Sequence, residues 1–124
     1  MLENQTITAI VPAYNEEPRL SQVLKVLENV QFIDEVLVID DGSRDGTAQV
    51  PSSMAVDVLR HNKNKGKGAA LVSGIRNKSE SDVYLFLDAD LIHLNEKHLY
   101  ELVKPIIKDS SIVMTIGVFK GGRG

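Results

Sequence analysis

The sequence predicts an α/β fold, with a mainly parallel sheet flanked by helices on both faces. Short apolar runs rich in β-branched residues recur along the chain, and amphipathic helical repeats separate them. Strands that alternate with helices are joined by right-handed crossovers, which place neighbouring strands parallel. At 124 residues the chain is long enough for one domain with a real core and too short for two. We therefore expect residues 1–124 to form a single domain.

Five strands alternate with helices in the expected element order. Strands are predicted over residues 6–11, 36–39, 56–59, 83–87 and 112–119, a helical turn over 46–50 and a helix over 68–77. Apolar residues recur at positions i, i+3, i+4 and i+7 within residues 20–27 and again within 99–106, which indicates two amphipathic helices. Pro18 suits the first turn of the earlier helix, and Asn95 is a suitable N-cap for the later one.

Composition excludes several functional classes. The chain has no cysteine, so it holds no disulfide, no thiolate nucleophile and no zinc–thiolate site. A net charge of -3, from 14 basic and 17 acidic residues, gives no general footprint for nucleic acid. The longest apolar runs fall far below the roughly 18 residues that span a bilayer. The expected location is the cytoplasm.

Polar sequence follows each of the first four predicted strands, in residues 12–17, 40–43, 61–68 and 88–90. In an open parallel sheet the carboxyl ends of the strands meet at one edge, and ligands bind there. Acidic pairs follow two of these strands and a loop rich in glycine and lysine follows a third, which exceeds the ordinary polarity of loops. These segments predict one shared ligand site.

The segment Asp88-Ala89-Asp90 closes the apolar run of the fourth strand. Two carboxylates about 5 Å apart repel each other by roughly 3 kcal/mol at an effective dielectric constant near 20, and a divalent cation would turn that repulsion into attraction. The spacing therefore suggests a metal site made by Asp88 and Asp90. The alternative is that the two aspartates only cap the following helix, where aspartate is favoured.

The segments after the second and third strands each allow two interpretations. Residues 40–43 form either a tight turn or the place where a carboxylate accepts a hydrogen bond from a base or ribose, and Asp41 is the better candidate because it lies further from the strand. The lysines of residues 61–68 are either a solvated charge run or part of a phosphate site that includes Lys67, because Gly66 and Gly68 precede a helix whose free N–H groups and dipole favour anions. The loop lacks the Walker spacing, and no G-x-G-x-x-G follows the first strand, which argues against a dinucleotide dehydrogenase.

An aromatic residue follows the first strand. Tyr14 either packs or forms a wall or backbone clamp for a flat base, with Pro12 fixing the turn, while Glu16 could be an exposed residue favoured at a helix start. Ser43 has no evident histidine partner, and the histidines show no metal-ligand spacing. None of these is assigned to catalysis: Ser43, His61, His93 and His98.

Taken together, residues 11–17, 38–47, 64–68 and 86–90 resemble family 2 glycosyltransferases of the GT-A fold in sequence, order and spacing. The resemblance covers nearly the whole chain and is specific as a set, although each segment alone is weak. Within the family, the opening segment and Asp88-Ala89-Asp90 look most similar to the branch that transfers sugars to polyprenyl or dolichyl phosphate.

The resemblance implies a metal-dependent, inverting transfer of a sugar from a nucleotide-diphospho-sugar. It implies that Asp41 contacts the base or ribose, that Asp88 approaches the nucleotide sugar, and that Asp90 coordinates Mg2+ or Mn2+ on the diphosphate. With Lys67 from the glycine and lysine loop, the predicted nucleotide-sugar site is Pro12, Tyr14, Glu16, Asp41, Lys67, Asp88 and Ala89, and the predicted metal ligands are Asp88 and Asp90.

Two alternatives stay open. A sugar-nucleotide pyrophosphorylase combines a related sheet with a metal and a nucleotide, but it would show a glycine-rich signature with arginine and lysine after the first strand, where this chain has residues 12–15. A nucleotide-sugar-binding module would keep the pocket without transferring a sugar. Turnover by a full-length protein, with binding alone by residues 1–124, would distinguish an inactive fragment from an inactive gene product.

The resemblance also sets expectations about what the chain lacks. Family members usually continue well beyond this length and often supply an acidic general base there; no residue of this chain matches that base, so we expect the N-terminal, donor-binding half of a longer enzyme. UDP-sugar and GDP-sugar donors both stay open, as do a polyprenyl phosphate or another glycan or lipid as acceptor and a place at the cytoplasmic face of the membrane. Exposed apolar surface at the chain's final elements would favour a homodimer.

Overall fold

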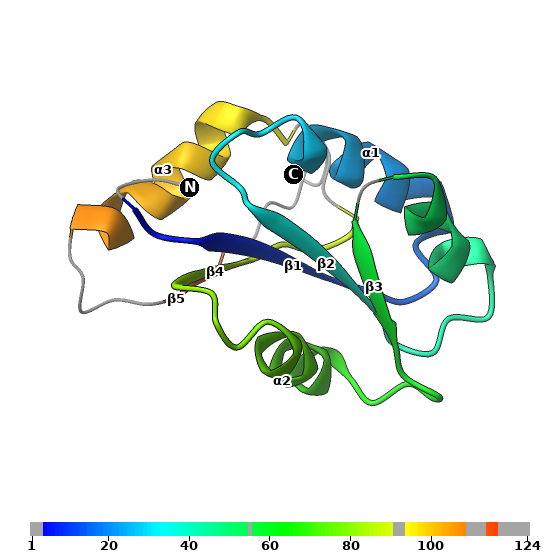
Figure 1. Ribbon diagram of the computed structural model, residues 1–124. Coiled ribbons are helices and arrows are strands. Elements are labelled where there is room, and N and C mark those ends of the chain that lie inside the picture. The colour runs from blue at the N-terminus through cyan, green and yellow to red at the C-terminus, as the bar shows by residue number, and fades with distance from the viewer. Residues whose placement is uncertain (1–3, 55, 91–93, 109–113, 117–124) are drawn as a thin grey trace, which may run out of the picture.

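A computed structural model describes residues 4–54, 56–90, 94–108 and 114–116. One sheet forms the middle layer, with α1 and α3 on one face and α2 on the other (Figure 1). The elements in chain order are β1 (Ile7–Ala13), α1 (Glu17–Glu28), β2 (Glu35–Asp40), the 3-10 helix η1 (Gly46–Ser53), β3 (Asp57–Arg60), α2 (Lys67–Asn77), β4 (Val83–Phe86), α3 (Glu96–Lys108) and β5 (Met114–Ile116). The predicted α/β architecture is confirmed.

The sheet has the strand order β3-β2-β1-β4-β5, and every neighbouring pair is parallel. The chain moves outward from β1 through β2 to β3 and then returns to the other side of β1 to form β4. The order therefore reverses between β1 and β4. In doubly wound sheets a ligand crevice opens at such a switch point, beyond the carboxyl ends of the strands.

The core consists of two apolar layers, one on each face of the central strand β1, whose seven residues are all buried. Successive side chains of a strand point to opposite faces. Ile7, Ala9 and Val11 accordingly belong to the larger cluster, which includes the buried residues of α1 and α3. Ile10 faces the other way and belongs to the cluster that includes Ala70 of α2. This two-sided burial fixes β1 rigidly under the rim where the predicted site residues begin.

Several boundaries differ from the sequence prediction. β1 continues to Ala13, so Pro12 lies inside the strand, in register with Ile39. The pairing with β4 has already ended at Ile10, so the missing N–H of Pro12 breaks no ladder on that side. Leu87 follows β4 rather than ending it, although its N–H still donates to the carbonyl of Ile10 at 3.1 Å.

The remaining elements agree in kind with the prediction. η1 is longer than the single turn expected over residues 46–50. Pro18 lies in the first turn of α1, and the Oδ1 atom of Asn95 accepts the N–H of His98 at 3.0 Å, so Asn95 caps α3 as predicted. Within the predicted strand 112–119 the structure describes only β5, and the rest lies outside the described residues. No helix in the described ranges has the length and apolar character needed to cross a bilayer.

Candidate functional site

The predicted site residues meet at the carboxyl edge of the sheet. A pocket of about 130 Å3 opens there between the end of β1, the segment after β2 and the start of α2. Four of the seven predicted nucleotide-sugar residues line it. The full lining is Pro12, Ala13, Tyr14, Asp41, Asn64, Gly66, Lys67 and Ala70.

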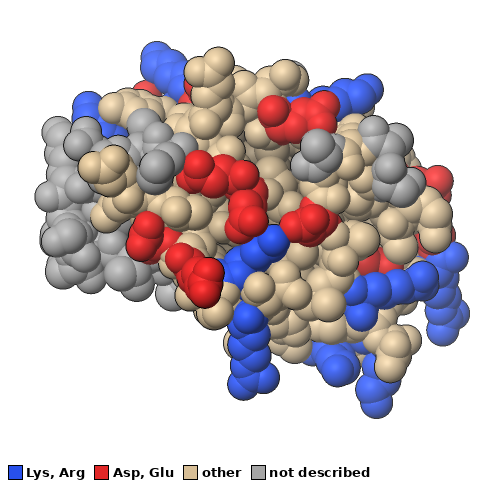
Figure 2. Space-filling view, viewed as in Figure 1, with Lys and Arg blue, Asp and Glu red and all other residues tan. Residues whose placement is uncertain are grey.

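Tyr14 stands between this pocket and a second, larger hollow. The residue is 45% exposed, which leaves its side chain free to cover a ligand. The second hollow has a volume of about 490 Å3 and is lined by Tyr14, Gly42, Ser43, Arg44, Arg60, Asn62, Lys63 and Asn64. Figure 2 shows lysine and arginine side chains gathered on the side of the molecule where β3 and the segment after it lie. This side of the rim therefore favours anions.

Asp40, the last residue of β2, is an internal brace. The side chain of Asp40 is fully buried, and its Oδ1 atom accepts the N–H of Ser43 at 3.0 Å. Its Oδ2 atom lies 3.2 Å from Nε of Arg60, and Nη2 of Arg60 donates to the carbonyl of Ser43 at 3.0 Å. Asp40 thus closes the turn that presents the next residue to the rim.

Asp41 is also buried, and its carboxylate joins three segments. Oδ1 accepts the backbone N–H of Lys65 at 2.9 Å and lies 2.7 Å from Nδ1 of His61, and Oδ2 accepts the N–H of Gly66 at 2.8 Å. Burial opposes ionisation, but the hydrogen bonds from His61, Lys65 and Gly66 outweigh it and hold the pKa of Asp41 below its ordinary value. Asp41 is therefore an ionised acceptor in the wall of the pocket.

The backbone of the lysine-rich loop is bound to Asp41. The N–H groups of Lys65 and Gly66 donate to its carboxylate and are therefore not free for phosphate. An anion at this loop would instead face the first turn of α2, which begins at Lys67 and whose initial N–H groups have no carbonyl one turn earlier. Gly66, at φ +94°, makes the bend that brings the loop back to Asp41.

Acidic side chains collect beside the pocket. Asp88 and the exposed Asp90 follow β4, and Lys67 reaches across the rim to form an ion pair with Asp88. Glu16 precedes α1, and its carboxyl is close enough to both aspartates for their charges to affect it. Burial and the negative charges of Asp90, Asp45 and Asp88 raise the pKa of Glu16, and the positive charge of Arg19 partly opposes this rise. Ala89, which separates the two aspartates in the sequence, is buried.

The carboxylates of Asp88 and Asp90 suit a hard divalent cation that is also coordinated by oxygens from a ligand or from water. Asp88 and Asp90 offer carboxylate oxygens, which Mg2+ and Mn2+ prefer. In the part of the chain that the structure describes, no three His, Cys, Asp or Glu side chains form a ready-made metal cage. A cation at this place would therefore need oxygens from a ligand or from water, as Mg2+ does when one or two carboxylates and a phosphate hold it.

His61 is the residue that sequence reasoning missed. It follows β3, its side chain is 8% exposed, and its ring contacts Asp41 through Nδ1 and the Oγ atom of Ser73 through Nε2 at 2.8 Å. The search for metal-ligand spacing could not find it, because its partners lie 20 and 12 residues away along the chain. His98 lies in α3, and His93 lies outside the described residues.

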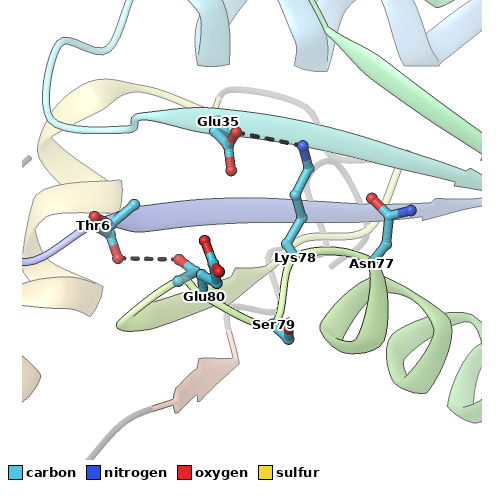
Figure 3. Close-up of a pocket in the computed structure, with 7 residues that line it drawn as sticks. Thr6, Glu35, Asn77, Lys78, Ser79 and Glu80 are labelled. Carbon is cyan, nitrogen blue, oxygen red and sulfur yellow. Dashed lines mark hydrogen bonds and ion pairs between the residues drawn. The ribbon is translucent and has the colours of Figure 1, made fainter.

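A further pocket lies at the opposite edge of the sheet and is lined by none of the predicted residues. It has a volume of about 580 Å3 and is lined by Thr6, Glu35, Asn77, Lys78, Ser79, Glu80 and Ser81 (Figure 3). The ammonium of Lys78 is held by Asp57 at 2.6 Å and Glu35 at 3.4 Å, and the hydrogen bond to Asp57 raises the pKa of Lys78. These contacts connect the C-terminal end of α2 to the first residues of β2 and β3. The candidate functional site is the one at the carboxyl edge, where the predicted residues lie.

A doubly wound parallel sheet with an acidic and basic rim at its switch point is the architecture of a nucleotide-binding α/β domain. Comparison with known proteins is more specific. The family model described as glycosyl transferase family 2 matches residues 8–124, so the chain belongs to this family. The family expected from the four polar segments is confirmed.

Curated relatives include enzymes named for lipid-linked sugar transfer. The chain is 29% identical to the UDP-N-acetylglucosamine–dolichyl-phosphate N-acetylglucosaminyltransferase of Methanococcus voltae, over 88% of this chain and 50% of that protein. It is 32% identical to the dolichol-phosphate mannosyltransferase of Pyrococcus furiosus, over 94% of this chain and 34% of that protein. The chain thus spans half or less of the length of these two relatives.

Solved structures of GT-A glycosyltransferases resemble the fold. Glucosyl-3-phosphoglycerate synthase from Mycobacterium tuberculosis, in complex with Mn2+ and UDP-glucose, superposes with a TM-score of 0.76 at 28% identity, covering 88% of this chain and 42% of that one. Mannosyl-3-phosphoglycerate synthase from Rubrobacter xylanophilus superposes with a TM-score of 0.75 at 26% identity, covering 85% and 37%. The predicted GT-A fold is confirmed.

Proposed function

We propose that this chain is the donor-binding portion of a metal-dependent, inverting glycosyltransferase that uses a nucleotide-diphospho-sugar. The observation that carries the proposal is the convergence of Pro12, Tyr14, Asp41 and Lys67 on one pocket, where Lys67 is paired with Asp88. Asp90 follows two residues later, and its charge acts on Glu16. The relative from Methanococcus voltae is named for a UDP-sugar, and the mycobacterial structure holds UDP-glucose with Mn2+, which supports this class of donor.

Different residues of the pocket would bind different parts of the donor. The exposed ring of Tyr14 provides a wall for a flat base, and Pro12 shapes the backbone beneath it. Asp41 lines the pocket as an acceptor for a ribose hydroxyl or a base N–H. Lys67 and the first turn of α2 provide positive charge for the diphosphate. The donor base stays open between uridine and guanosine.

The acidic side of the rim provides the place for the metal. Asp88 and Asp90 would hold Mg2+ or Mn2+, and Glu16 would add negative charge nearby. Ala89, between the two aspartates in the sequence, would contribute its backbone at the same place. When bound, such a cation supplies Lewis-acid stabilisation of the charge that develops on a departing nucleoside diphosphate. Lys67 forms an ion pair with Asp88 in this structure. The lysine therefore has two possible partners, this carboxylate and the diphosphate of a bound donor.

The acceptor is proposed from the relatives. The proteins from Methanococcus voltae and Pyrococcus furiosus are named for transfer to dolichyl phosphate or dolichol phosphate. We extend this to a polyprenyl phosphate acceptor for the full-length protein, reached from the cytoplasmic face of a membrane. The general base is assigned to no residue of this chain.

Calorimetric titration tests the donor site directly. The 124-residue chain would be titrated with UDP, GDP and their glucose and mannose conjugates, with and without Mn2+. We expect metal-dependent binding that is lost in Asp90→Asn and retained in Glu28→Gln, a control that removes an exposed carboxylate at the far end of α1. Binding of none of these ligands by demonstrably folded chain would contradict the proposal. Synthesis of a sugar nucleotide from a nucleoside triphosphate would favour a pyrophosphorylase instead.

A further inference from the structure

A hydrogen-bonded chain, buried at His61 and Asp41, runs from α2 to the wall of the proposed nucleotide pocket. Ser73, in the middle of α2, contacts Nε2 of His61 at 2.8 Å, and Nδ1 of His61 contacts Asp41 at 2.7 Å. Asp41 in turn accepts the N–H groups of Lys65 and Gly66. Helix, histidine, aspartate and loop are thereby connected through bonds of 2.7 to 2.9 Å.

The chemistry of Asp41 fixes the direction of the inner bond, and a neutral imidazole would fix that of the outer one. An ionised carboxylate only accepts, so Nδ1 of His61 carries the proton that faces Asp41. In the neutral ring Nε2 is then the acceptor, and the hydroxyl of Ser73 donates to it. The Ser73 hydroxyl thus fixes the ring from the helix side, and the ring fixes the carboxylate from the sheet side. A histidine held this way keeps one tautomer and one orientation.

We propose that His61 is a positioning residue for the donor site: acting through Asp41, it holds the turn at Lys65 and Gly66 and thereby sets where α2 begins. This inference rests on the proposed function, since the pocket that it shapes is the proposed nucleotide pocket. His61 itself is not among the residues that line the pocket, whereas Asp41, Gly66 and Lys67 are. Its effect on a ligand is therefore transmitted through Asp41.

The connectivity of serine, histidine and aspartate also occurs in hydrolases, but the surroundings here do not suit a nucleophile. Ser73 lies inside α2 and does not line the pocket at the rim. His61 is buried, with both ring nitrogens engaged. A nucleophilic serine needs an open approach for substrate and donors for an oxyanion. The arrangement fits the support of a loop better than an attack on a substrate.

Two isosteric substitutions separate the two ends of the chain. In His61→Asn the amide nitrogen occupies the place of Nδ1 and can still donate to Asp41, but nothing reaches Ser73. In His61→Gln the amide nitrogen occupies the place of Nε2 and can reach Ser73, but the bond to Asp41 is lost. Ser73→Ala removes the outer bond alone, with Ser79→Ala as its control at an exposed position on the opposite rim.

Two measurements on the 124-residue chain then test the proposal. The first is hydrogen exchange of the Lys65 and Gly66 amides by NMR, without any ligand. The second is calorimetric affinity for UDP and GDP with Mn2+. We expect His61→Asn to resemble the wild type in both, and His61→Gln to lose protection of both amides and about tenfold in nucleotide affinity, as the loss of a hydrogen bond to a charged group implies.

The outcomes separate this proposal from the proposed function. Full amide protection and unchanged nucleotide affinity in His61→Gln would overturn the positioning role while leaving the donor site intact. The reverse order, with His61→Asn impaired and His61→Gln normal, would also overturn it and assign His61 to anchoring α2. If the wild type binds no nucleotide, the proposed function fails, and loss of amide protection confined to His61→Gln would still support the positioning of the loop.

Discussion

Lys67 and Asp88 form an ion pair across the rim, between the first residue of α2 and the second residue after β4. A lysine ammonium and a divalent cation are alternative partners for one carboxylate. In the free chain the lysine therefore competes with a metal ion at Asp88. A nucleoside diphosphate would offer the lysine a second anion and release the carboxylate. The pair thus couples the two halves of the proposed donor site.

The first prediction follows from this competition. Lys67→Met should raise the affinity for Mn2+ alone by about two- to fivefold, because an exposed ion pair contributes about 0.2–1 kcal/mol. The same substitution should weaken the binding of UDP or GDP, because it removes a positive charge from the proposed diphosphate site. Titration of free Mn2+ by electron paramagnetic resonance, with and without nucleotide, measures both effects.

A matched substitution shows whether net charge alone accounts for the result. Lys25→Met removes an exposed lysine from α1 and should leave both affinities unchanged. If Lys67→Met and Lys25→Met behave alike, the competition at Asp88 is wrong. A rise in Mn2+ affinity that occurs only in Lys67→Met supports it.

The parts of the fold and site that the sequence predicted are those that local patterns determine. Runs of β-branched residues bounded by polar segments located each of the strands in the described part of the chain, because such runs fit a sheet covered on both faces. The parallel order then brings the carboxyl ends of the strands to one edge, so the rim could be predicted without knowing any contact within it. Asp88 and Asp41 lie at this edge for that reason.

The bonds within the rim could not be predicted in the same way. The partners of Asp41 depend on how the loop after β3 folds back over the segment after β2, which no local pattern encodes. The glycine and lysine pattern indicated free N–H groups at the start of the following helix, but it did not indicate that Lys65 and Gly66 donate to a buried carboxylate, which needs such donors. His61 was missed for the same reason. Its role depends on its burial and on contacts with residues far away in the sequence, which no local pattern encodes.

The second prediction concerns the close approach of two loops at Gly42. This residue has φ +79°, and a Cβ atom there would lie 2.6 Å from the carbonyl carbon of Lys63. Gly42→Ala should therefore destabilise the fold by about 2 kcal/mol or more, because both the conformation and the space exclude a side chain. Gly68→Ala is the control: its Cβ meets nothing within 4 Å, and helix propensity should make it neutral or stabilising by up to about 1 kcal/mol. Urea denaturation of both variants distinguishes them, and equal effects would contradict the loop contact.

The third prediction concerns the packing of α2 on the sheet. A Cβ atom at Gly74 would lie 2.8 Å from Cγ2 and 2.9 Å from Cδ1 of Ile10, which is fully buried. Gly74→Ala should cost about 1–3 kcal/mol of stability through overpacking. Ile10→Val removes the Cδ1 atom and should relieve part of that cost, so a double-mutant cycle measured by denaturation should show favourable coupling. Strict additivity of the two substitutions would show that they do not meet.

The fourth prediction concerns pH and Asp41. Folding lowers the pKa of this carboxyl below its ordinary value of 3.8, so the ionised form stabilises the fold. That contribution is complete above the ordinary pKa and is lost as the pH falls through the lower pKa of the folded state. Asp41→Asn should therefore reduce stability at neutral pH by about 1–3 kcal/mol, since an amide nitrogen would face one of the N–H groups that the carboxylate accepts.

The acid limb of the stability profile separates Asp41 from the other carboxylates. The pKa of Asp45 is also lowered, chiefly by its hydrogen bond from Thr47, so the wild type has more than one source of acid sensitivity. The difference between wild type and Asp41→Asn isolates the contribution of Asp41, and it should shrink as the pH falls below about 4. Glu28→Gln, an exposed control, should run parallel to the wild type at every pH. Denaturant unfolding across this pH range measures the three curves. A difference between wild type and Asp41→Asn that stays constant with pH would mean that the ionised carboxylate is not what holds Lys65 and Gly66.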